Sequence, residues 1–165
     1  MTKVLFSAVI ALMVTAPAYA ASGNTSTDTG SAVANVIAPI VLTHTSGATL
    51  NFGSFTTGAG GTVVVTSAGG GSTTAEVTFV PGTIEAADQF TVKGDRSRSF
   101  AVSTGNGTVS LGGTSIGFTT AASTTTTTLN AAGTAAFSVG GTLTLLGTEA
   151  AGAYGGTYDA TVTYN

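Results

Sequence analysis

The strongest constraint on this chain is a two-residue alternation of apolar and polar side chains, which recurs in short runs between glycine-rich breaks. Such alternation is typical of half-buried β-strands, and glycine supplies the positive φ that tight hairpins require. We expect strands at residues 33–43, 49–55, 62–66, 74–80, 89–93, 99–103, 108–111, 115–120, 135–139, 142–146 and 157–164. The breaks lie at residues 58–61, 69–71, 105–107, 112–113, 140–141 and 155–156. This many short strands in one domain predict an all-β sandwich or barrel, and Asn106-Gly107 is its strongest hairpin signal.

Residues 1–20 have the pattern of a secretory signal peptide. Lys3 precedes an apolar run over residues 4–14, and Ala18-Tyr19-Ala20 forms a small-x-small cleavage site. The apolar run is shorter than the ~20 residues that a membrane-spanning helix requires. We therefore expect an exported chain with a flexible polar leader over residues 21–32, a single domain over residues 33–165, and no transmembrane helix.

The charge and cysteine content exclude several classes of partner. After residue 20 the chain has three basic residues against seven acidic ones, so nucleic acid, whose phosphates require basic clusters, is not an expected partner. The chain has no cysteine, so an exported product cannot be stabilised by disulfides and depends on packing and strand pairing.

A serine motif is the only catalytic pattern in the sequence. Residues 113–117 match G-x-S-x-G, in which Ser115 would be a nucleophile on a strand-to-helix turn. A strand-like run follows Ser115, however, and His44, the only histidine, precedes it in the chain, whereas that fold places the histidine after the serine. With one histidine, no cysteine and scattered acids, a metal site also lacks ligands. We expect no enzyme, no catalytic residue, no metal and no cofactor.

Two polar segments have structural interpretations. The charged residues between 85 and 98 predict a solvated hairpin, with residues 93–97 as its turn. The five threonines of residues 124–128 have two polar faces, which predicts an exposed edge.

Residues 33–43 form the most apolar stretch after the expected signal peptide. As a strand, this segment would be apolar on both faces, and Pro39, which lacks an N–H, favours an edge position or a kink between two sheets. Two interpretations are open: the segment is the first strand of its own domain, or it is donated to a neighbouring subunit.

The C-terminus alternates up to the end of the chain, so its edge must be paired, covered or offered to another chain. Residues 158–164 carry a Tyr-x-x-x-Val-x-Tyr pattern, Tyr164 is the penultimate residue, and Gly152 is fourteenth from the end. With Leu50-Asn51-Phe52-Gly53 near the other end, the chain resembles subunits of Gram-negative chaperone-usher pili and a group of uncharacterised bacterial surface domains related to them.

The resemblance implies an immunoglobulin-like antiparallel β-sandwich that is completed by strand donation between subunits. It would make the chain a structural subunit of an extracellular fimbrium-like filament, which passes through the periplasm to the cell surface. Its partners would be other copies of itself, with a periplasmic chaperone and an outer-membrane usher. The implied interface residues are Val33, Val36, Ile37, Ile40 and Leu42 on the donor side, and Tyr158, Val162 and Tyr164 beside the acceptor groove.

Two features depart from familiar pilins. The chain lacks their usual disulfide, and one apolar segment has to serve either as donor or as first strand. The alternative function is a secreted or cell-surface β-sandwich that binds or adheres without polymerising.

Overall fold

The structure, a computed structural model, describes residues 23–165. The expected signal peptide lies outside the described residues. The described chain has two parts, residues 23–35 and a compact unit, Val36–Asn165. Residues 23–40, which we call the arm, form no strand. All of the strands lie after the arm, within the compact unit.

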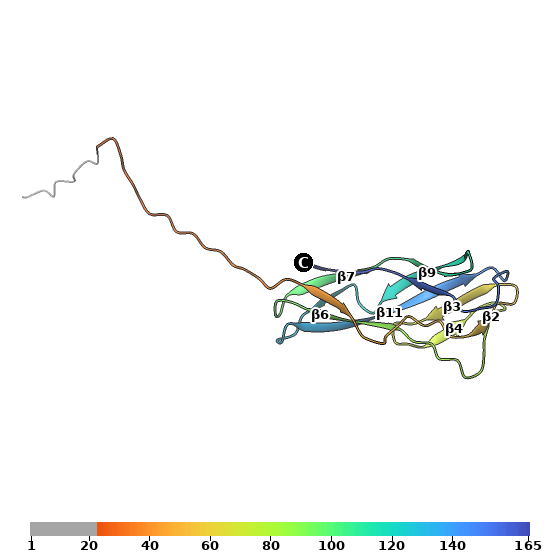
Figure 1. Cartoon of the computed structure of the whole chain (residues 1–165). Coiled ribbons are helices and arrows are strands. Elements are labelled where there is room, and N and C mark those ends of the chain that lie inside the picture. Colours follow the sequence, from red (N-terminus) through yellow and green to blue (C-terminus); the bar gives the residue numbers. More distant parts are fainter. Residues whose placement is uncertain (1–22) are drawn as a thin grey trace, which may run out of the picture. The chain divides into compact units, whose positions relative to one another are not determined.

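The compact unit is built from strands, and within residues 23–165 there is no helix (Figure 1). No helix of the described part of the chain is therefore long and apolar enough to cross a membrane. The strands are β1 (Val41–His44), β2 (Phe55–Thr56), β3 (Gly61–Val65), β4 (Gly71–Thr73), β5 (Thr78–Phe79), β6 (Asp88–Lys93), β7 (Ser99–Thr104), β8 (Gly107–Leu111), β9 (Thr114–Ala122), β10 (Thr126–Thr128), β11 (Thr134–Leu145), β12 (Gly155–Thr157) and β13 (Ala160–Tyr164).

These strands form an antiparallel sandwich, which confirms the predicted all-β fold. One sheet has eight strands in the order β1-β6-β11-β9-β8-β12, with β3 paired to β11 and β4 paired to β3. A three-stranded sheet, β10-β7-β13, packs against the larger sheet as the other layer, and β2 and β5 form a separate pair. The predicted edge at the threonine run is confirmed, because β10 pairs only with β7.

The long strand β11 organises the larger sheet. Its first half pairs with β6, its second half pairs with β3, and its opposite side pairs with β9. The predicted break at residues 140–141 is wrong, because β11 runs straight through Gly140 and Gly141. These glycines permit close approach instead: a Cβ on Gly140 would collide with the carbonyl oxygen of Val65, and one on Gly141 with that of Thr119.

Two predicted hairpins are connections between sheets. Strand β7 belongs to the smaller sheet and β8 to the larger, so Asn106-Gly107 joins two sheets. The turn at residues 93–97 likewise joins β6 to β7 across the sandwich. A two-residue hairpin does occur at Gly112 and Gly113, where both glycines have positive φ and Leu111 pairs with Thr114.

The alternation places two clusters of apolar side chains between the layers. The first cluster contains Phe52, Val63, Val65, Val77, Ile116, Phe118, Leu143 and Leu145. The second contains Phe90, Val92, Phe100, Val102, Leu129, Phe137 and Val139. Tyr158 packs against both clusters, and its ring makes edge contacts with Phe90 and Phe118.

Candidate functional site

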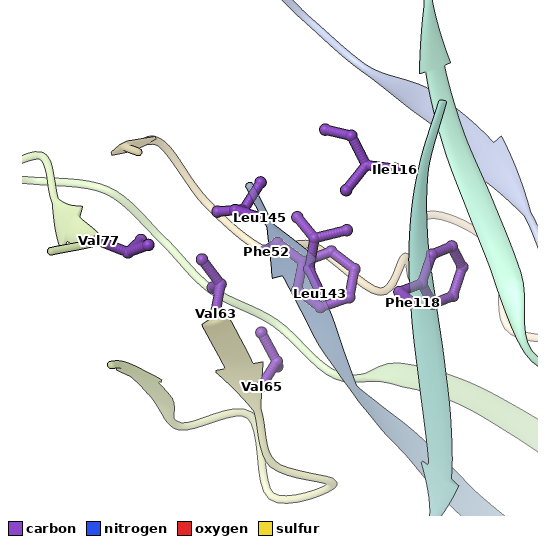
Figure 2. Packing of buried hydrophobic residues seen from close by; sticks show 8 residues of the cluster. All are labelled: Phe52, Val63, Val65, Val77, Ile116, Phe118, Leu143 and Leu145. Atoms are coloured by element: carbon purple, nitrogen blue, oxygen red, sulfur yellow. The ribbon is translucent and has the colours of Figure 1, made fainter. Parts of the chain in front are cut away.

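An apolar groove lies over the first cluster and is the candidate functional site. Its volume is about 1260 Å³, above the ~300–1,000 Å³ of most small-molecule pockets. One wall is residues 49–58, the other is residues 149–158, and the floor is formed by Val109, Ile116, Phe118, Leu143 and Leu145. Figure 2 shows how side chains from β3, β9 and β11 converge with Phe52 in this half of the sandwich. Within the described chain, no backbone–backbone hydrogen bond joins the two walls.

The first wall presents an unpaired strand edge to the groove. Asn51 exchanges both of its backbone hydrogen bonds with Ala86, at 2.8 and 3.0 Å. In an antiparallel pair, neighbouring residues turn their N–H and C=O groups to the opposite side. Leu50 and Phe52 therefore point their backbone groups away from Ala86, and no described residue forms a backbone hydrogen bond with either of them.

The second wall also has unpaired backbone. Strand β12 pairs with β8, but residues 150–154 form no backbone–backbone hydrogen bond within the described chain. Glu149 anchors the start of this wall, because its carboxylate accepts the N–H groups of Leu146 at 2.6 Å and Gly147 at 2.9 Å. Partial burial of Glu149 acts to raise its pKa, but these and neighbouring backbone donors outweigh burial and lower the pKa.

A buried carboxylate closes the inner end of the groove. Asp88, only 5% exposed, begins β6. Its Oδ1 lies 2.6 Å from Nε2 of His44 and accepts the N–H of Gln89 at 2.8 Å, while its Oδ2 accepts the hydroxyl of Tyr158 at 2.8 Å. Burial raises the pKa of Tyr158, and the hydrogen bond to Asp88 raises it further. This network ties together β1, β6 and the segment between β12 and β13.

The predicted donor residues divide into two groups. The expected strand at residues 33–43 is wrong in extent, since β1 covers only Val41–His44. Ile40 and Leu42 pack against the second cluster of their own domain. Val33 and Val36 are 97% and 94% exposed, and Ile37 is 38% exposed. Val41 is 50% exposed as well, but its backbone is paired with Lys93 in the sheet. Val33, Val36 and Ile37 are thus the exposed apolar side chains of the segment that lie outside a strand.

The three residues predicted to lie beside the acceptor groove occupy two different places. Tyr158 lines the groove, whereas Val162 and Tyr164 pack against the second cluster, beyond the groove. The Tyr164 hydroxyl donates to the carbonyl of Ala38 at 3.0 Å and accepts the N–H of Asp95 at 2.6 Å. The penultimate tyrosine therefore holds the last part of the arm against the turn between β6 and β7.

The structure does not bring the serine motif and the histidine together. Ser115 lies in β9 and shares a 2.7 Å hydrogen bond with Ser110, while His44 ends β1. Strands β6 and β11 lie between β1 and β9 in the sheet.

Sequence reasoning missed the free edge at Leu50 and Phe52 and the partners of Asp88. The Leu-Asn-Phe-Gly motif was the available signal for the edge. No local pattern pointed to Asp88, whose partners are 44 and 70 residues away in the chain.

Comparisons with known proteins give one family. No curated protein matches the chain, and no solved structure matches it. The model of the DUF4402 family, described as a domain of unknown function, matches residues 42–164, which is well over half of the chain. The matched region begins within β1 and ends at the last residue of β13, and the chain belongs to the DUF4402 family.

Proposed function

We propose that this protein is a structural subunit of an extracellular, fimbrium-like filament on a bacterial surface. Residues 33–38 of one copy enter the groove of the next copy as an added β-strand. The observation that carries this proposal is the groove itself, an apolar trough beside the unpaired edge of Leu50 and Phe52. Adding an extended strand to such an edge is an established mode of peptide recognition.

The dimensions of the groove match the donor segment. The length of the groove can be measured along β11. Asp88, at the inner end of the groove, pairs with Val139 of β11, and Leu145 of the same strand lines the outer end. At about 3.3 Å per residue, the part of β11 between Val139 and Leu145 spans about 20 Å, the length of a strand of about six residues. Residues 33–38 are six residues long and carry the exposed Val33, Val36 and Ile37.

Burial of these side chains supplies a driving force. In an extended strand Val33 and Ile37 share one face and Val36 lies on the other, so one or two of them enter the groove. Each valine or isoleucine that leaves water contributes about 1.5–3 kcal/mol, which gives about 1.5–6 kcal/mol before ordering costs are subtracted. Backbone hydrogen bonds to Leu50, Phe52 and residues 150–154 add to this, because these groups have no backbone partner in the described chain.

The positions of the arm and the groove favour a filament over a closed dimer. Val41, which follows the arm, pairs with Lys93, and Lys93 pairs with Thr134 at the start of β11. Leu145, at the other end of β11, lines the groove. Because β11 has 12 residues and rises about 3.3 Å per residue, these ends are about 36 Å apart. Figure 1 shows β1, in orange, beginning at the end of the unit opposite β2, β3 and β4. Head-to-tail contact between such unlike ends extends into a filament when it does not close into a ring.

The sequence features agree with this proposal. The expected signal peptide would export the chain. The resemblance to chaperone-usher pilins implies a donor in the same N-terminal segment, but of the acceptor residues that it implies only Tyr158 lines the groove. A periplasmic chaperone and an outer-membrane usher are the partners that this route of assembly would use.

A deletion that spares β1 tests the proposal. A chain that begins at Pro39 keeps Ile40 and Leu42 in the core, so we expect a folded monomer that cannot polymerise. The chain of residues 21–165 should form a ladder of species on denaturing gels when it is not boiled. A capped peptide of residues 31–40 should bind the shortened chain, as measured by isothermal titration calorimetry.

Single charges in the arm provide the matched controls. Val36→Asp and Ile37→Asp lie on opposite faces of an extended strand, so the substitution that abolishes the ladder identifies the face that enters the groove. Thr27→Asp, in the polar part of the arm, should leave the ladder intact. Absence of peptide binding together with a monomeric full chain would favour a binding module that does not polymerise.

A further inference from the structure

The charged side chains are segregated between the two ends of the compact unit. Among residues 23–165 there are three cations, Lys93, Arg96 and Arg98, and all lie at or beside the turn between β6 and β7. Asp95 is the one acid within this turn, which we call the basic turn (residues 93–98). Three of the other acids, Glu76, Glu85 and Glu149, lie beside the groove. The two ends therefore have opposite charge.

The basic turn and the end of the arm form one surface. Lys93 pairs with Val41, the first residue of β1. The Tyr164 hydroxyl bridges the Ala38 carbonyl and the Asp95 N–H, and the Arg98 guanidinium lies 5.6 Å from the centre of the Tyr164 ring. Lys93 and Arg96 are exposed. Any partner that receives residues 33–38 must also approach these two cations.

One of these acids lines the groove, and the other two lie against residues of its first wall. Glu149 is part of the second wall, and backbone hydrogen bonds hold its pKa below the ordinary glutamate value. Glu76 accepts the N–H of Ala59 at 3.0 Å, directly after Gly58 of the first wall. The Glu85 side chain lies against Gly53 of the same wall. No cation lies among the groove-lining residues of the described chain.

We propose that the basic turn of one copy docks against the acidic walls of the next copy, beside the donated arm. This inference rests on the proposed function and adds a second contact to it, one that orients the incoming subunit. Complementary charge chiefly accelerates encounter and suppresses wrong registers, and salt screens it. The arm then enters from the Glu149 side, with Val33 towards Tyr158, and runs antiparallel to residues 149–158.

A charge-swap experiment on the chain of residues 21–165 tests the docking contact. In Lys93→Glu/Arg96→Glu, like charges face each other, so we expect seeded elongation, followed by light scattering, to slow about 10-fold or more at 20 mM salt. The difference should vanish at 0.5 M salt, where the screening length is only a few ångströms. Adding Glu76→Lys/Glu85→Lys to the same chain reverses the charges at both docking surfaces, so they attract each other again. We expect this variant to elongate at the wild-type rate.

Two controls separate this inference from the proposed function. Asp159→Lys changes an exposed acid outside the groove lining and the basic turn, and should leave elongation unchanged. The capped peptide of residues 31–40 carries no charge, so it should bind wild-type and Glu76→Lys/Glu85→Lys grooves equally. Peptide binding with no effect of the charge reversals on elongation overturns the docking contact alone. Failure of the peptide to bind either groove overturns the proposed function, and the docking contact with it.

Discussion

At the scale of single residues, Asp88 shows how a buried carboxylate holds distant segments together. Its three donors come from His44, Gln89 and Tyr158, and no buried side-chain nitrogen or oxygen of the described chain lacks a partner. The sequence predicted a strand that ends at residue 43, one residue before the end of β1 at His44. It could not reveal Asp88, because sequence patterns report local periodicity, whereas this network joins residues brought together only by the sheet.

Removing one donor tests the network. Tyr158→Phe keeps the ring against Phe90 and Phe118 but leaves Oδ2 of Asp88 without its tyrosine donor. We expect the free energy of unfolding, from urea titration at pH 7, to fall by about 1–3 kcal/mol. An unchanged value would show that another donor replaces the hydroxyl.

The same hydroxyl predicts a difference at alkaline pH. Because the pKa of Tyr158 is raised in the folded chain, the folded state holds this proton more tightly than the unfolded state does. Its contribution to stability is therefore present below the ordinary tyrosine pKa of about 10 and decreases as the pH rises above it. Thermal unfolding between pH 9 and 11 should show a steeper loss of stability for the wild type than for Tyr158→Phe.

At the scale of elements, alternation predicted the inner strands well. Strand β6 alternates strictly between buried and exposed residues, because one of its faces packs on the core while the other faces solvent. Glycine was the less reliable signal. Gly112 and Gly113 form a hairpin, whereas Gly140 and Gly141 lie inside β11, where a neighbouring backbone comes too close for a side chain. Sequence alone does not distinguish a glycine that adopts a positive φ in a turn from one that allows a neighbouring backbone to approach closely.

Two glycines in the larger sheet test this distinction. Gly140→Ala would place a Cβ against the backbone around Val65 and Thr66, so we expect a loss of about 1–3 kcal/mol in unfolding free energy. Gly117 lies in β9 with open space around the corresponding position. Gly117→Ala should therefore be neutral or stabilising by up to about 1 kcal/mol. Equal losses in urea titrations of both variants would contradict this role for Gly140.

At the scale of the whole molecule, composition and alternation were sufficient to predict an all-β sandwich, but not the groove. The second wall of the groove is poor in large apolar residues, and residues 150–153 are only alanine and glycine. Residues 150–153 form a wall of the groove only because the fold places them opposite Leu50 and Phe52. The resemblance implied a donor over residues 33–42, and the packing of Ile40 and Leu42 against the second cluster of their own domain was not predictable from it.

Occupation of the groove should stabilise the entire domain. A ligand that binds only the folded state at 100 times its dissociation constant adds about 2.7 kcal/mol to the unfolding free energy. We expect the shortened chain, saturated with the 31–40 peptide, to gain about this amount in urea titrations. A Val36→Asp/Ile37→Asp peptide should add nothing. Equal stabilisation by both peptides would indicate non-specific adsorption.

The separation of arm and groove along β11 also gives an assembly a direction. In any such row of subunits, one terminus bears an unfilled groove and the other a free arm, so the two termini differ chemically and grow at different rates. A short peptide can stop growth only at the terminus with the unfilled groove, and a subunit that lacks the arm only at the other. The ratio of stopper to subunit would then set the mean filament length.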